Sequence, residues 1–124
     1  MAKVEIFSRA GATWLRTLEA IRFELAGEEY TIPAGFECDG ASIPRAFWRI
    51  IGPPIDCQYV KEAIIHDYLY REQPVSRDIA DRDFFDRLDK PRLKIRRYLI
   101  YISVRLFGWK AWNKNKKGKN GKNV

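Results

Sequence analysis

Residues 65–85 read IHDYLYREQPVSRDIADRDFF and hold the turn between two predicted helices. Apolar residues recur at helical spacing over residues 58–70, and Pro74 ends this first helix because proline cannot continue one. Ser76 is a favourable N-cap residue, so a second helix is expected over residues 76–88. The connection between the two helices is short, and they should therefore lie antiparallel and adjacent.

The segments on either side of this hairpin complete an α+β pattern. Pro91 suits the first turn of a third helix, which we expect to run to Phe107 with Gly108 as its C-cap. Short runs rich in β-branched and aromatic residues predict strands at residues 4–7, 14–18, 21–25 and 29–32, with a strand fragment at 35–38. The prediction is a small antiparallel N-terminal β-sheet packed on three C-terminal α-helices.

The charge of the chain is concentrated at its C-terminal end. The formal net charge is +7, but residues 110–124 contain six lysines and no acidic residue. The remainder carries 17 basic and 16 acidic residues, so it is nearly neutral. We expect one domain over residues 1–112 and a basic, disordered tail over residues 113–124.

From the sequence we expect neither a signal peptide nor a membrane span. The longest apolar segment, YLIYISVRLFGW, is interrupted by Arg105 and is well short of the roughly 20 residues that a spanning helix needs. We therefore expect a protein of a reducing cytoplasm, with Cys38 and Cys57 as thiols and not as a disulfide.

A candidate site emerges from the helical spacing. His66, the only histidine of the chain, shares one stripe of the first helix with Tyr70. Asp81 shares the core-facing stripe of the second helix with Phe84, and a buried carboxylate needs a partner. We therefore predict a hydrogen bond between Asp81 and His66, with Asp67 alongside. Such a pair is either a general base oriented by an acid or a satisfied polar network in a small core.

The loop GFECDGASIP, residues 35–44, supplies a second group of polar side chains. In a functional interpretation Asp39 joins Asp67 in holding a cation, and Ser42 donates a hydrogen bond to substrate. In a structural interpretation Asp39 and Ser42 cap the turn and the segment that follows it. A zinc site built from Cys38, Cys57 and His66 is a further alternative, but its spacing matches no standard zinc pattern.

Five blocks follow one another along residues 30–112: IPAGFECDGASIPRAFW, IGPP, AIIHDYLYR, PVSRDIADRDFF and RLFGWKAW. Together they resemble a domain-of-unknown-function family that is widespread in tailed bacteriophages and in bacterial genomes carrying prophages. The resemblance implies a phage or prophage origin, with the host cytoplasm or the virion as the location. It implies no particular activity.

The pair HDYLY and IADRDFF also resembles the H-D-x-x-Y and A-D-x-x-F motifs of phospholipases A2. This resemblance implies that His66 is the base, Asp67 a calcium ligand, Tyr70 a support and Asp81 the orienting acid. Calcium would polarise the ester carbonyl. The glycine-rich calcium loop of those enzymes is missing in its usual form, and their disulfides are absent.

Two functions follow as hypotheses. The preferred one is a phage or prophage accessory protein that is virion-associated or binds a host component, with a phage or host protein as partner. The alternative is a small metal-dependent hydrolase, with calcium favoured over zinc and His66 as the general base. The lysine-rich tail is either a solubilising extension or a contact to nucleic acid or an anionic surface.

Overall fold

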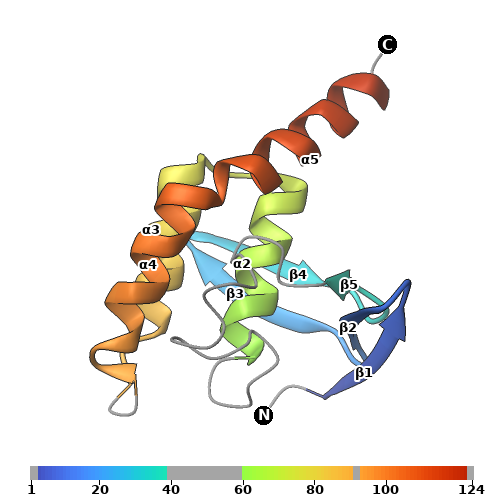
Figure 1. Cartoon of the computed structure of the whole chain (residues 1–124), viewed down its shortest axis with the longest axis horizontal. Helices are drawn as coiled ribbons and strands as arrows, with labels where there is room; N and C mark the ends of the chain where they lie inside the picture. Colours follow the sequence, from blue (N-terminus) through green and yellow to red (C-terminus); the bar gives the residue numbers. More distant parts are fainter. Residues whose placement is uncertain (1–2, 39–59, 91–92, 123–124) are drawn as a thin grey trace.

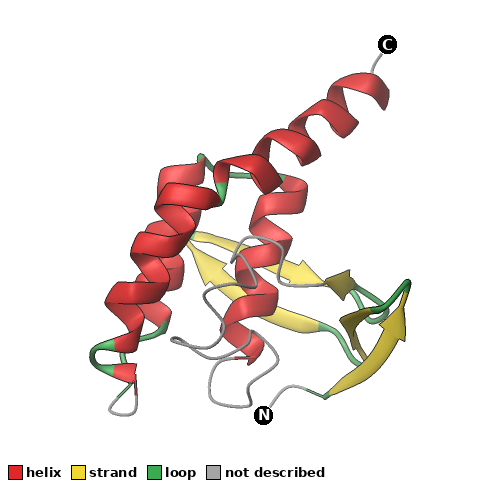
Figure 2. Ribbon diagram, viewed as in Figure 1, coloured by secondary structure: helices red, strands yellow, loops and turns green. Residues whose placement is uncertain are grey.

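The computed structural model describes residues 3–38, 60–90 and 93–122, which form two antiparallel sheets followed by four helices (Figures 1 and 2). One sheet has the strand order β1-β2-β5, and the other pairs β3 with β4. The strands are β1 Val4–Arg9, β2 Ala12–Thr17, β3 Ile21–Leu25, β4 Glu28–Ile32 and β5 Glu37–Cys38. The predicted α+β class is confirmed, and the single predicted sheet is corrected to two.

Both β-hairpins turn on the dipeptide Ala-Gly. Ala10 and Gly11 have φ angles of 50° and 79°, and Ala26 and Gly27 have 53° and 83°. Two-residue hairpin turns with positive φ at both positions match the right-handed twist of the strands. The turn residues therefore fix the registers that pair Arg9 with Ala12 and Leu25 with Glu28.

The helices are α2 Val60–Glu72, α3 Arg77–Arg87, α4 Arg96–Phe107 and α5 Trp109–Lys122. Ser76 caps α3 as predicted, since its side-chain oxygen accepts a hydrogen bond from the Ile79 amide at 3.4 Å. The third predicted helix begins later than expected, at Arg96 instead of Pro91. Within the described segments, no helix is both long enough and apolar enough to cross a membrane.

The prediction of a disordered tail from residue 113 is wrong at the level of secondary structure, because α5 continues to Lys122. Starting a helix is its costly step. Here Gly108 keeps helical angles of −65° and −18°, so α5 follows α4 directly. Gln73 donates a hydrogen bond to the Trp112 carbonyl at 2.8 Å, and the Trp112 ring meets Tyr70 edge-on at 5.3 Å. These contacts hold the first turns of α5 in place.

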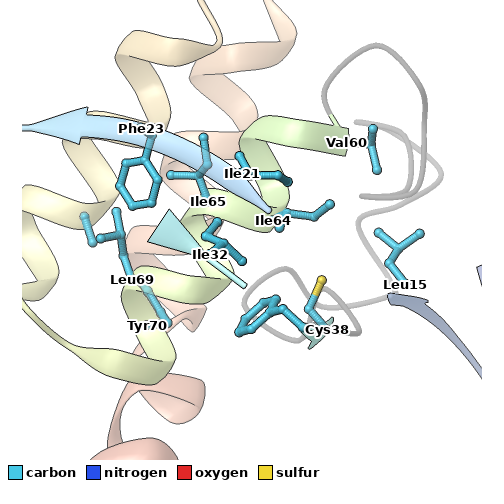
Figure 3. Packing of buried hydrophobic residues seen from close by; sticks show 12 residues of the cluster. Leu15, Ile21, Phe23, Ile32, Cys38, Val60, Ile64, Ile65, Leu69 and Tyr70 are labelled. Carbon is cyan, nitrogen blue, oxygen red and sulfur yellow. The ribbon is translucent and has the colours of Figure 1, made fainter. Parts of the chain in front are cut away.

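The helix α2 carries the core on two sides. On one side it packs against the strands through residues such as Ile64, Ile65 and Leu69, as Figure 3 shows. On the other side Ala63 joins a cluster with α3 and α4 that includes Phe84 and Ile100. Because α2 is buried from both directions, its polar residues at 66 and 70 lie inside the fold.

Candidate functional site

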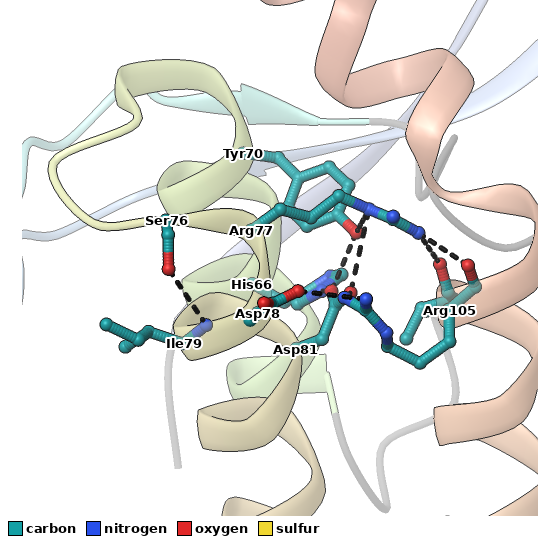
Figure 4. A network of polar contacts seen from close by, with 9 residues as sticks. His66, Tyr70, Ser76, Arg77, Asp78, Ile79, Asp81 and Arg105 are labelled. Carbon is teal, nitrogen blue, oxygen red and sulfur yellow. Dashed lines mark hydrogen bonds and ion pairs between the residues drawn. The ribbon is translucent and has the colours of Figure 1, made fainter.

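The predicted cluster forms where α2, α3 and α4 meet (Figure 4). His66 and Tyr70 lie one turn apart on α2, and both reach the same oxygen of Asp81 on α3. The distances to Asp81 Oδ1 are 2.8 Å from His66 Nε2 and 2.6 Å from Tyr70 Oη. Asp81 is 0% exposed, His66 1% and Tyr70 2%. The structure therefore brings together the three residues that the sequence nominated as base, support and acid.

Two arginines complete the cluster, and the sequence analysis missed both. Arg105 from α4 donates to Asp81 Oδ2 at 2.8 Å, while Arg77 Nε lies 3.7 Å from the same oxygen. Arg77 also donates to Tyr70 Oη at 3.2 Å and to the carbonyls of Val104 and Arg105 at 2.7 Å each. Arg77 thereby ties the start of α3 to the last turn of α4, where the Val104 carbonyl also accepts a hydrogen bond from the Gly108 amide at 2.8 Å.

A sequence signal existed for each arginine. Arg105 interrupts an otherwise apolar run, which is typical of a charged side chain with a buried partner. Arg77 precedes Asp81 by four residues, the spacing at which side chains on one helix face each other.

The electrostatics of the cluster keep Asp81 ionised. Burial by itself would raise the pKa of Asp81, but the hydrogen bond and charge of His66, with hydrogen bonds from Tyr70 and Arg105, outweigh it and lower the pKa. An ionised carboxylate only accepts hydrogen bonds, so His66 Nε2 carries the proton in this contact. In the neutral imidazole, Nδ1 is then the acceptor.

Tyr70 acts as a fixed hydrogen-bond donor. Burial, followed by the negative charge of Asp81, raises the pKa of the Tyr70 hydroxyl far above its usual value. The phenol therefore stays protonated and donates to Asp81. The His66 ring lies between Phe84 and Tyr70, with centroid distances of 4.4 Å to each ring. Packing and hydrogen bonding together define one orientation of the imidazole.

The residues proposed for a cation and for substrate are only partly within the described structure. Asp67 is half-buried and follows His66 on α2. Asp39, Ser42 and Cys57 lie outside the described residues. Over residues 3–38, 60–90 and 93–122, no group of three or more His, Cys, Asp or Glu side chains is placed to hold a metal ion. Among the carboxylates of the described residues, Asp67 is the one nearest to His66 in sequence.

The lowered pKa of Asp81 predicts a loss of stability in acid. Its carboxylate stabilises the fold fully above the unfolded-state pKa of about 4, and this contribution is lost as the pH falls through the lower folded-state pKa. We expect the free energy of unfolding, from urea titrations, to decrease below about pH 4 more steeply in the wild type than in Asp81→Asn. Parallel decreases in the two proteins would contradict this assignment.

Three comparisons place the chain among known proteins. The family model described as "Protein of unknown function (DUF1353)" matches residues 15–104. The uncharacterized protein y4jT of Sinorhizobium fredii (strain NBRC 101917 / NGR234) is 39% identical over 59 residues, which are 48% of this chain and 18% of that protein. The chain therefore spans less than a fifth of the length of that relative. No solved structure matches the chain significantly. The matched family residues include His66, Tyr70 and Asp81.

Proposed function

The chain belongs to the family of proteins of unknown function DUF1353, and for this member we propose hydrolysis of ester bonds with His66 as the general base. One observation carries the proposal: Asp81 Oδ1 accepts hydrogen bonds from both His66 Nε2, at 2.8 Å, and Tyr70 Oη. A general base must be held in one tautomer and one orientation. The carboxylate and the phenol together supply both conditions.

The proposed chemistry uses the second ring nitrogen. With the Nε2 proton donated to Asp81, Nδ1 of His66 accepts a proton from a water molecule that attacks the ester carbonyl. The imidazolium that forms is stabilised by the ionised Asp81. Asp67, with Asp39 as the second expected carboxylate, would bind a divalent cation of the calcium type, since such cations prefer oxygen ligands. Bound there, the cation would polarise the carbonyl and stabilise the oxyanion.

The test combines calcium binding with ester hydrolysis. Wild-type protein and Asp67→Asn are titrated with calcium chloride by calorimetry, then assayed on a short-chain phosphatidylcholine and a p-nitrophenyl ester. We expect the variant to lose stoichiometric calcium binding and at least about 10-fold in hydrolysis rate, because one cation ligand is removed. Zinc chloride is titrated in parallel as the alternative metal.

Two controls separate chemistry from folding. Asp86→Asn makes the same substitution at an exposed carboxylate of α3, and it should leave binding and rate unchanged. His66 is the only histidine of the chain, so its ring nitrogens give unambiguous NMR signals. These signals should report the Nε2-protonated tautomer in both Asp67→Asn and the wild type. Absence of hydrolysis by the folded wild type with either metal would refute the proposal.

A second candidate is a phage or prophage accessory protein in which the cluster is purely structural. The observation in its favour is that Arg105 and Arg77 already compensate the charge of Asp81. Such a protein would act in the host cytoplasm or in the virion and bind a phage or host protein. A folded wild type with the expected tautomer but without cation binding or hydrolysis supports this candidate.

A further inference from the structure

Helix α4, with Ile95 just before it and Trp109 at the start of α5, carries a continuous apolar stripe on its outer surface. Its five main positions are residues 95, 99, 102, 106 and 109. Their spacings of four, three, four and three residues place them on one helix face. The stripe consists of Ile95, 77% exposed, Leu99, 40%, Ile102, 51%, Leu106, 60%, and Trp109, 48%. Tyr98, 54% exposed, lies along one edge. We call these six residues the outer stripe.

The opposite face of α4 is also apolar and is already used by the core. Ile100 and Val104 are 0% exposed and pack with Phe84. A surface helix normally buries one apolar face and presents a polar one to water. Since the core accounts for only one of the two faces, the outer stripe requires a separate explanation.

The charges that α4 and α5 themselves carry are all of one sign. From residue 90 to residue 124 the sequence contains 12 lysines and arginines and no acidic residue. Arg97 pairs with Asp89, and Arg105 pairs with Asp81 and Asp78. Lys94 and Lys110 are exposed near the two ends of the stripe. The stripe therefore faces outward within a region of net positive charge. The lysine-rich helix α5 continues this region and projects away from the body of the fold (Figure 1).

We propose that α4 and the start of α5 bind the surface of an anionic lipid bilayer, with the outer stripe inserted at the level of the headgroups. A helix with apolar residues on one face and lysines or arginines beside them suits this location. Tyr98 and Trp109 have rings that favour the boundary between water and hydrocarbon. Anionic headgroups complement the excess of basic residues.

The same observations disfavour other occupants. A second copy of the chain would bring two sets of like charges together. Nucleic acid would neutralise the lysines but would leave the aliphatic side chains of the stripe exposed. A bilayer satisfies the charge and the apolar surface at once.

The test is co-sedimentation with vesicles made of ether-linked phospholipids. These lipids contain no carboxylic ester bond, so the outcome is independent of the proposed ester hydrolysis. Vesicles of phosphatidylcholine alone are compared with vesicles containing about 30 mol% phosphatidylglycerol. The stripe variant is Leu99→Gln/Ile102→Gln. The matched control is Leu18→Gln/Ile79→Gln, which changes one exposed leucine and one exposed isoleucine away from α4.

We expect the wild type and the control to bind the anionic vesicles equally, and the stripe variant to bind at least about 10-fold more weakly. Equal binding by both variants would overturn the proposal, because lysine attraction alone would then suffice. Equal binding to neutral and anionic vesicles would also overturn it. So would a wild type that ignores vesicles and instead forms dimers, or binds an acidic helical peptide, through the stripe.

Discussion

Asp81→Asn should lower the free energy of unfolding by about 3–5 kcal/mol, the range typical for removing one partner of a buried charge network. The amide has nearly the shape of the carboxylate but no negative charge. Arg105 and Arg77 then lose their shared anion inside the fold. The new amide NH2 group is a donor, and it would replace one of the two accepting oxygens. It would then point at another donor, either His66 and Tyr70 on one side or Arg105 on the other.

The matched control for this prediction is Asp86→Asn. Asp86 lies on the same helix and its carboxylate is 3.6 Å from Arg82, but that side chain is 64% exposed. Exposed ion pairs contribute little, and we expect a change below about 0.5 kcal/mol. Urea unfolding of the two variants and the wild type measures both changes. Similar losses in both variants would contradict the central role of Asp81 in the polar network.

The core of the site was predictable from the sequence because it depends on local geometry. His66 and Tyr70 are one turn apart on a single helix, and a short connection brings the next helix alongside. Asp81 occupies a core-facing position of that second helix. Its partner was therefore expected on the opposing face of the first helix, where His66 and Tyr70 lie. The pairing at 2.8 Å confirms this reasoning.

Arg105 was not predictable in the same way, whereas Arg77 faces Asp81 at a spacing of four residues on the same helix. Arg105 reaches Asp81 only because α4 packs against α3, and helical spacing alone does not specify that packing. The division of the strands into two sheets has a similar cause. The strand β5 pairs with β2 through Leu15 and Cys38, a contact between residues far apart in the chain. The hairpins, by contrast, depend on adjacent Ala-Gly turn residues and were predictable.

The helix α5 shows how tertiary contacts override composition. The sequence after Trp112 has no apolar period, which by itself predicts disorder. In the fold, Asn115 Nδ2 donates to the Tyr70 carbonyl at 3.3 Å, one turn beyond the Trp112 contacts. A helix that is already started needs only propagation, for which lysine is a good residue.

Gly108→Ala should lower the free energy of unfolding by about 2 kcal/mol, although alanine favours helices by up to about 1 kcal/mol over glycine. A Cβ atom at this position would lie 2.6 Å from Tyr70 Oη and 2.5 Å from the Val104 carbonyl oxygen. The Tyr70 hydroxyl cannot move away easily, because Asp81 accepts its hydrogen bond and Arg77 donates to it. The backbone of Gly108, with φ of −65°, would accept any residue. Glycine is required here because α2 lies so close to the junction of α4 and α5.

A double-mutant cycle with Tyr70→Phe tests this cause directly. Tyr70→Phe removes the oxygen that the new Cβ would meet, so Gly108→Ala should cost less in that background, by about 1 kcal/mol or more. Urea unfolding of the four proteins gives the coupling. If Gly108→Ala costs the same with tyrosine and with phenylalanine, the strain does not come from the hydroxyl but from the Val104 carbonyl and the ring carbon Cε2 that phenylalanine retains. A positive coupling would show that the polar cluster also determines how closely the last helix approaches α2.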